Sequence, residues 1–176
     1  MSIMSSVHVE RPADSDFPAC LPLLSALHNG DIGKAMKDCF AEFCCGPNAV
    51  ALVARQGGEV VGMIAGTEVP DLDFEAHVAT VNAIIVSRRS RGRGIGLALM
   101  DGFMQWARER GCVAVLQRTR RQGARRFLRS VGFERSTSSS GFVKYLVSPE
   151  QLGKPHGAEG CYARTRLSAG GQDGQP

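Results

Sequence analysis

Three glycines alternate with two arginines and an isoleucine in residues 91–96. Glycines just before a helix let the backbone pass close to a ligand, and the first N–H groups of that helix lack internal partners. Those donors and the positive end of the helix dipole favour phosphate oxygens, and arginine adds bidentate donors beside them. The sequence therefore predicts a pyrophosphate-binding loop formed by Arg91, Gly92, Arg93, Gly94, Ile95 and Gly96.

Two familiar phosphate loops do not fit this spacing. A Rossmann fingerprint requires Gly-x-Gly-x-x-Gly and an acidic residue about 20 positions later, whereas these glycines follow Gly-x-Gly-x-Gly. A Walker loop requires Gly-Lys-Ser/Thr, and residues 91–96 contain no lysine. A tight strand-to-helix turn with a solvated basic face, and no ligand, remains an alternative.

Local sequence patterns predict the strands and the helix on either side of the loop. An apolar run, Val81–Val86, is typical of a buried strand, and apolar residues recur at helical spacing after Gly94. Gly111 stands where a left-handed helix C-cap is expected. A second apolar run, Cys112–Gln117, predicts a strand parallel to the first, joined to it by a right-handed crossover. The apolar face of the helix is formed by Ile95, Leu99, Met100, Phe103, Met104 and Ala107.

The remaining chain predicts further strands and helices around this unit. A hairpin is expected around Gln56-Gly57-Gly58, and a third strand should complete an antiparallel meander. The expected strands are Val7–Arg11, Ala49–Arg55, Glu59–Thr67, about His77–Val86 and a final hairpin ending near Val147, and the expected helices are Asp14 or Ser15 to about His28, Asp31 to about Cys45, and Gln122–Val131.

Length and composition suit one globular domain. The chain has 176 residues, 43% of them hydrophobic and 22% charged, which is ordinary for a domain with a proper core. We expect a domain at residues 7–147 and a flexible tail at 148–176, because glycines interrupt every periodic run there. The competing interpretation is that Cys161–Leu167 forms a further strand on the sheet edge.

Several classes of function are disfavoured by charge and cysteine usage. Of the 21 Lys and Arg residues, 12 lie between Arg88 and Arg129, but no stacking aromatics accompany them, so a polyanionic cofactor is favoured over nucleic acid. No apolar run is long enough to span a bilayer, and no signal peptide is visible. The adjacent Cys44 and Cys45 lack metal-ligand partners, so no metal site and a reducing cytoplasmic location are expected.

Two segments resemble a known family. The run from Val86 through Arg91–Gly96 resembles the acetyl-CoA loop of the GNAT N-acetyltransferases, Arg/Gln-x-x-Gly-x-Gly/Ala, preceded by the strand-ending valine of that family. Residues Ala124–Phe133 resemble its second signature, Ala-x-x-Phe-Tyr-x-x-x-Gly-Phe. The resemblance implies the GNAT fold, an α/β (α+β mixed) architecture. Its central sheet is mixed and mostly antiparallel, with one parallel splayed strand pair, and helices flank it.

The resemblance also implies how acetyl-CoA would be bound as a cosubstrate. The pantetheine arm would lie between the fourth and fifth strands along main-chain groups, and the pyrophosphate would lie on the glycine loop. The cofactor-binding residues implied in this way are Ile84, Ile85, Val86, Arg91, Gly92, Arg93, Gly94, Ile95, Gly96 and Phe127.

Catalytic residues are less well matched. Leu128 stands where the family often has a tyrosine that protonates the leaving thiolate, and Arg121 stands where it often has an asparagine. Tyr145 is the candidate substitute acid. An ammonium must lose a proton before it attacks, and Thr80, beside Asn82, stands where some members have a glutamate base. The candidate bases are Glu75 and His77, with Glu68 as a further neighbour.

The function implied is acetyl transfer from acetyl-CoA to a primary amine by direct attack on the thioester. The alternative is a GNAT-fold protein that binds CoA with little or no catalysis, in a regulatory or sensor role. The acceptor could be an antibiotic amine, a polyamine, an amino acid or a protein N-terminus, since the first helices and the late hairpin contain no motif that decides. Assembly as a homodimer is also open.

Overall fold

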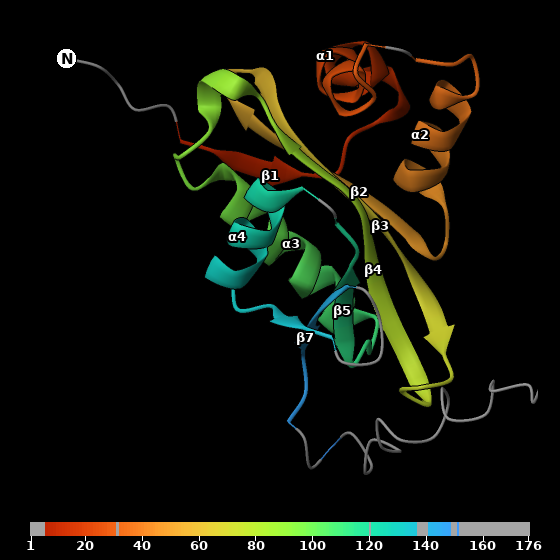
Figure 1. The fold of residues 1–176 in the computed structure, drawn as a ribbon. Coiled ribbons are helices and arrows are strands. Elements are labelled where there is room, and N and C mark those ends of the chain that lie inside the picture. Colours follow the sequence, from red (N-terminus) through yellow and green to blue (C-terminus); the bar gives the residue numbers. More distant parts are fainter. Residues whose placement is uncertain (1–5, 31, 120, 137–140, 149–150, 152–176) are drawn as a thin grey trace, which may run out of the picture.

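A computed structural model describes residues 6–30, 32–119, 121–136, 141–148 and 151, and the structural statements below refer to these. One seven-stranded sheet, in the order β1-β2-β3-β4-β5-β7-β6, has helices on both faces (Figure 1). The strands are β1 His8–Glu10, β2 Ala49–Gln56, β3 Glu59–Asp71, β4 Ala76–Val86, β5 Ala114–Gln117, β6 Glu134–Arg135 and β7 Phe142–Tyr145. The α-helices are α1 Phe17–Leu27, α2 Met36–Cys45, α3 Ile95–Glu109 and α4 Gln122–Ser130.

Strands β2, β3 and β4 form an antiparallel meander, as predicted. Strand β1 pairs antiparallel with β2 beyond it. Gly57 and Gly58 both have positive φ (60° and 85°), the conformation that lets a two-residue turn follow the twist of the strands it joins. The parallel pair is also confirmed, because β5 runs beside β4 with Val78 opposite Ala114 and Val81 opposite Gln117. The sheet is therefore mixed and mostly antiparallel.

A bulge in β4 changes which side chains face which helices. Ala65 of β3 pairs with Ala83 while the next residue, Gly66, pairs with Val81, so Asn82 is an extra residue in β4. An extra residue shifts the alternation of a strand by one. Before the bulge the odd-numbered Val81 joins the core under α3, and after it the even-numbered residues Ile84 and Val86 pack there instead.

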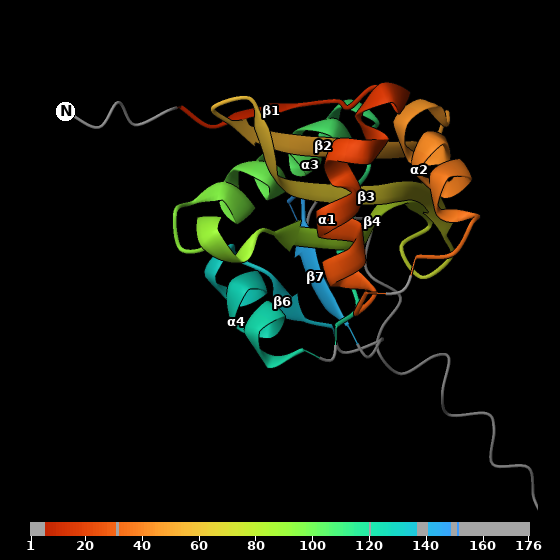
Figure 2. The same ribbon diagram turned by 90° about the horizontal axis from the view of Figure 1, so that it is seen from above.

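Helices α1 and α2 cover one face of the sheet, and α3 and α4 cover the other (Figure 2). The core under α1 and α2 includes Leu24 and Phe40 packed on strand residues such as Val53. The core under α3 and α4 is larger, and in it Leu99 and Phe103 have no exposed surface. All the residues predicted for the apolar face of α3 are buried: Ile95, Leu99, Met100, Phe103, Met104 and Ala107.

Two glycines of α3 have structural explanations. A Cβ on Gly102 would lie 3.1 Å from Leu52 and 3.3 Å from Val9, so a mid-helix glycine, costly for the helix itself, lets α3 pack closely on β1 and β2. After the helix, Gly111 has φ +75°, and the Cys112 N–H donates to the Ala107 carbonyl. This is the predicted left-handed C-cap.

One helix boundary differs from the prediction. The second helix was expected from Asp31, but α2 begins at Met36, preceded by a turn closed by the hydrogen bond from Met36 N–H to the Gly33 carbonyl. Glycine disfavours helix, which accounts for the later start; Asp31 lies outside the described residues, as does the predicted tail apart from Ser148 and Gln151. In the described part of the chain, every helix is too short or too polar to cross a bilayer.

Candidate functional site

The two parallel strands separate at one end. Among the described residues, β4 and β5 pair only from Val78 to Val81 on β4, although β4 continues to Val86. The last pair is Val81 with Gln117, directly before the bulge at Asn82. Residues 82–86 of β4 thus have β3 on one side and lack β5 on the other, which leaves a strand edge where an extended ligand could bind.

The glycine loop lies at the end of this edge. The loop leaves β4 after Val86, makes one turn of 3₁₀ helix at Arg88–Ser90, and enters α3 through Gly92 (φ +73°) and Gly94 (φ +79°). The first bond of α3 runs from Ala98 N–H to the Gly94 carbonyl, and Gly94, as N-cap, has no side chain to cap the earlier N–H groups. The N–H groups of residues 95–97 therefore form the anion-binding end of a helix.

Helix α4 lies beside the start of α3. A Cβ on Gly96 would come within 3.3 Å of the Phe127 ring, so the missing side chain lets these two helices approach. The outer surface of α4 is basic, with exposed Arg125, Arg126 and Arg129. The ion pairs within the described residues involve neither these arginines nor Arg91 and Arg93 of the loop. The result is a strongly positive surface around the helix end.

One predicted ligand-binding group already has a partner. The Arg91 side chain turns back so that its Nε donates to the Val86 carbonyl at 3.1 Å. A ligand that bound this carbonyl would have to displace the arginine. Because Arg91 is exposed, its guanidinium is also free to turn outward toward a phosphate.

A buried polar side chain stands where the strands separate. Gln117 is only 7% exposed, and its Oε1 atom has no hydrogen-bond partner in the part of the chain that the structure describes. Its neighbours across the sheet are Val81 of β4 and Phe142 of β7, both apolar and part of the core under α3 and α4. The sequence interpretation, which treated Cys112–Gln117 as one apolar strand, missed this residue; a glutamine ending such a run was the available signal.

The structure does not gather the residues predicted for proton transfer at one site. Leu128, which replaces the tyrosine of the signature, is fully buried in the core. Tyr145 is 47% exposed, with its ring 6.0 Å from that of Phe74. It pairs with Ala114 rather than Gln117, which puts it about 10 Å along β5 from the point of separation. The structure does not bring Tyr145 to the glycine loop, and its role as an acid stays a prediction.

His77 belongs to a polar network at the other end of α3. Its Nδ1 lies 2.6 Å from Glu68 Oε1, and Arg110 bonds the second carboxylate oxygen through Nε while its Nη2 donates to Asn48 at 2.9 Å. Arg110 follows the C-terminus of α3, which is about 22 Å from its N-terminus. The exposed Glu75 lies in the β3–β4 turn near His77, with φ +49°. Neither candidate base is brought to the glycine loop, and both assignments stay predictions.

The Glu68 carboxylate is held in its charged form. Burial by itself raises its pKa, but hydrogen bonds from Arg110 and His77 and their charges outweigh that effect, so the pKa lies below the ordinary 4.5. A carboxyl whose pKa is lower in the folded state stabilises that state above the unfolded pKa, and this contribution disappears as pH falls through the folded pKa. We infer a structural role for this network in joining β3, β4 and the end of α3.

This network predicts a pH-dependent stability difference. Glu68→Gln should lower the free energy of unfolding at pH 7, and the gap from wild type should begin to narrow as pH falls below about 4.5, where the carboxyl of the unfolded chain becomes protonated, and narrow further as pH passes through the lower pKa of the folded state. Urea unfolding at several pH values measures it. Glu59→Gln, at an exposed position of the same strand, controls for the loss of one negative charge. A gap for Glu68→Gln that stays constant from pH 7 to 3 would contradict the account.

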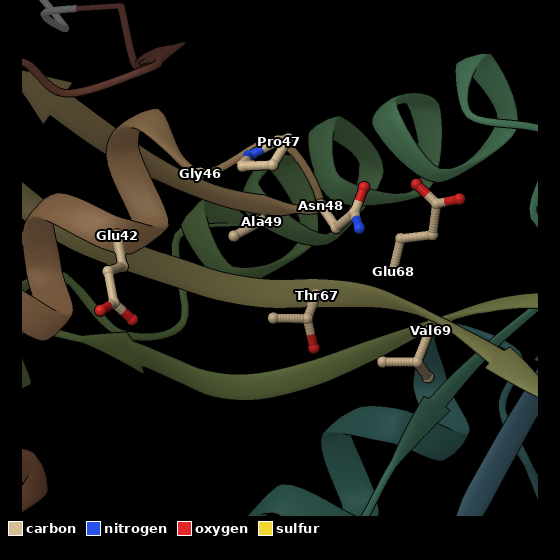
Figure 3. Close-up of a pocket in the computed structure, with 8 residues that line it drawn as sticks. All are labelled: Glu42, Gly46, Pro47, Asn48, Ala49, Thr67, Glu68 and Val69. Carbon is tan, nitrogen blue, oxygen red and sulfur yellow. The ribbon is translucent and has the colours of Figure 1, made fainter.

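The face of the sheet that carries α1 and α2 has polar groups and an open pocket near the β4 bulge. The Thr67 hydroxyl donates to the Asn82 side-chain oxygen at 3.3 Å, and Thr67 pairs with Thr80. Figure 3 shows Thr67 and Val69 on one side of β3 and Glu68 on the other. Thr67 also lines a pocket of about 400 Å³ between the end of α2 and β3, formed by Glu42, Gly46, Pro47, Asn48, Ala49, Thr67, Glu68 and Val69.

Comparisons with known proteins agree on one family. Residues 17–133 match the acetyltransferase (GNAT) family. Among curated proteins, the chain is 34% identical over 97 residues to N-acetyltransferase 8 of Mus musculus, covering 54% of this chain and 42% of that protein. It is 32% identical over 100 residues to the probable N-acetyltransferase family 8 member 5 of the same species, covering 54% and 44%. The match thus spans less than half the length of these relatives.

Solved structures share the fold. The aminoglycoside N-acetyltransferase AAC(6')-Iy in complex with CoA superposes with a TM-score of 0.68 at 18% identity, over 74% of this chain and 89% of that one. A transcriptional regulator from Bacillus halodurans gives a TM-score of 0.65 at 26% identity, over 74% and 95%. These likenesses support the fold described above.

Proposed function

Because the chain belongs to the acetyltransferase (GNAT) family, we propose that it is an N-acetyltransferase that transfers an acetyl group from acetyl-CoA to a primary amine. The observation that carries the proposal is the arrangement at the end of β4. There an unpaired strand edge leads directly to two left-handed glycines and the unpaired N–H groups of α3. An extended arm with a charged pyrophosphate matches this combination of groups.

The described residues fit the cosubstrate in three respects. The N-terminus of α3 suits phosphate oxygens, the arginines of the loop and of α4 supply uncompensated positive charge, and the β4 edge offers main-chain partners near Ile84 and Val86. Bound acetyl-CoA supplies the acetyl group as an activated thioester. In the proposed reaction the acceptor amine attacks the carbonyl carbon of the thioester directly, so that the N–C bond forms as the C–S bond breaks. CoA leaves as the thiolate, and the proton lost by the amine nitrogen passes to solvent.

The acceptor is proposed to approach from the face that carries α1 and α2. On that face Thr67 of β3 and Asn82 at the bulge present polar groups, and Glu42 is one of the residues that line the nearby pocket. A carboxylate there would attract an ammonium group. The acceptor class stays open among antibiotic amines, polyamines, amino acids and protein N-termini. A cytoplasmic location and assembly as a homodimer stay predictions.

One observation favours a second candidate, CoA binding with little catalysis. Leu128 occupies the position of the proton-donating tyrosine, and its side chain lies entirely within the core. A leucine cannot protonate a thiolate, so turnover would depend on another donor or on direct release of the thiolate to solvent. A regulatory or sensor role is the form that this alternative takes.

The two candidates are separated by one pair of measurements. Calorimetry with CoA measures binding, and thiol release from acetyl-CoA in the presence of an amine panel measures transfer. We expect CoA to bind and at least one amine class to produce thiol above the hydrolysis background. Binding without amine-dependent thiol release would favour the sensor role, and absence of CoA binding would reject both candidates.

A further inference from the structure

The Gln117 Oε1 atom makes no hydrogen bond to the described part of the fold. A buried polar atom without a hydrogen bond destabilises the protein that contains it, and Gln117 Oε1 is such an atom. An apolar residue there would match its neighbours Val81 and Phe142, which belong to the buried core. Since buried orphan groups are rare in folded proteins, this one calls for a partner that is absent from the ligand-free chain.

The position of Gln117 identifies where that partner would lie. Gln117 is the last residue of β5 and forms the last pair with β4, so it stands at the vertex between the two strands. A ligand arm that replaced β5 along residues 82–86 of β4 would end beside this vertex. The orphan atom is a carbonyl oxygen, which accepts hydrogen bonds and therefore needs a donor in the ligand.

We propose that Gln117 is a binding residue for the CoA cosubstrate, and that its side-chain carbonyl accepts a hydrogen bond from an amide N–H of the pantetheine arm. The arm has two secondary amides, and each carries one N–H donor. This inference rests on the proposed function, because it assumes that CoA occupies the separated strands. It assigns to β5 a polar contact in addition to the main-chain contacts expected from β4.

The proposal predicts opposite effects on stability and on binding. Gln117→Met keeps the length of the side chain and removes its polar atoms. The ligand-free variant should melt about 2–6 °C higher than wild type, since an unpaired buried polar group is replaced by an apolar one of similar shape. Its dissociation constant for CoA, measured by calorimetry without any amine, should be about tenfold higher, which means weaker binding. Gln105→Met, on the exposed face of α3, is the control and should change neither value by a comparable amount.

A second measurement does not depend on how the variant folds. In wild-type protein, the side-chain amide resonances of Gln117, assigned by through-bond correlation, should shift on addition of CoA. Unchanged CoA affinity in a folded Gln117→Met variant would overturn the proposal, as would wild-type Gln117 resonances that do not respond to saturating CoA. An effect confined to the KM of the amine would overturn it too, because the contact would then be with the acceptor. Failure of wild type to bind CoA at all would reject the proposed function instead.

Discussion

Replacement of Gly94 by valine is expected to weaken CoA binding at least about 100-fold. Gly94 has φ +79°, a conformation that costs an L-residue about 1–2 kcal/mol and a β-branched one more. Relaxation of that strain would turn the N–H groups at the start of α3 away from the pyrophosphate. Two charge-assisted hydrogen bonds of about 1.5–3 kcal/mol each would be lost, which corresponds to two or more orders of magnitude in affinity.

A matched control is available in the β2–β3 turn. Gly58 has φ +85° and, like Gly94, has nothing within 4 Å of an added Cβ. Gly58→Val therefore introduces the same kind of backbone strain far from the loop. Calorimetric titration with CoA should show near wild-type affinity for this variant and a large loss for Gly94→Val. Equal affinities in the two variants would reject the glycine loop as the binding site.

Gly66→Ala is expected to destabilise the fold by about 3 kcal/mol. A Cβ at this position would lie 2.4 Å from the Thr80 carbonyl oxygen and 2.5 Å from the Phe103 ring. The first contact is with backbone and the second with a fully buried ring, so neither neighbour has room to move. Overpacking of this kind costs about 1–3 kcal/mol, and more where backbone must shift. For a domain of this size the melting temperature should fall by about 6–12 °C.

The control for Gly66→Ala is Gly123→Ala in α4. An added Cβ on Gly123 meets nothing within 4 Å, and alanine favours helix over glycine by about 1 kcal/mol. Thermal unfolding followed by circular dichroism should therefore show little change or a small gain for Gly123→Ala. A melting temperature for Gly66→Ala within 2 °C of wild type, on the scale expected here, would show that the β4 bulge and Phe103 adjust more easily than their packing implies.

The strand, loop and helix of residues 81–110 could be predicted because their signals are local. The spacing of Leu99, Phe103 and Ala107 alone defines a buried helix face, and the glycines mark where the backbone takes positive φ. The start of α2 was predicted five residues early, because an apolar stripe continues backward past Gly33 into a segment that does not form helix.

Other parts of the site depend on contacts between distant segments. The bulge at Asn82 has no glycine or proline of its own, and it lies opposite Gly66, 16 residues earlier, where the Phe103 ring of α3 leaves no room for a side chain. His77 is close in sequence to the β4 edge, yet the register of β4 puts it beside Arg110 at the far end of α3. Whether the Gln117 Oε1 atom finds a hydrogen-bond partner depends on what surrounds its side chain, and no spacing in the sequence reveals that.

The insertion of β7 between β5 and β6 constrains the order in which a ribosome can complete this sheet. Synthesis passes Gln117 and Arg135 before it reaches Phe142, the first residue of the strand that lies between β5 and β6. At ordinary elongation rates the interval from Gln117 to Phe142 lasts roughly 1–5 s. During that time one edge of β5 lacks its neighbour, and an open apolar strand edge is a template for pairing with other chains. The nascent chain should therefore be most prone to aggregation, and most dependent on chaperones, just before β7 emerges.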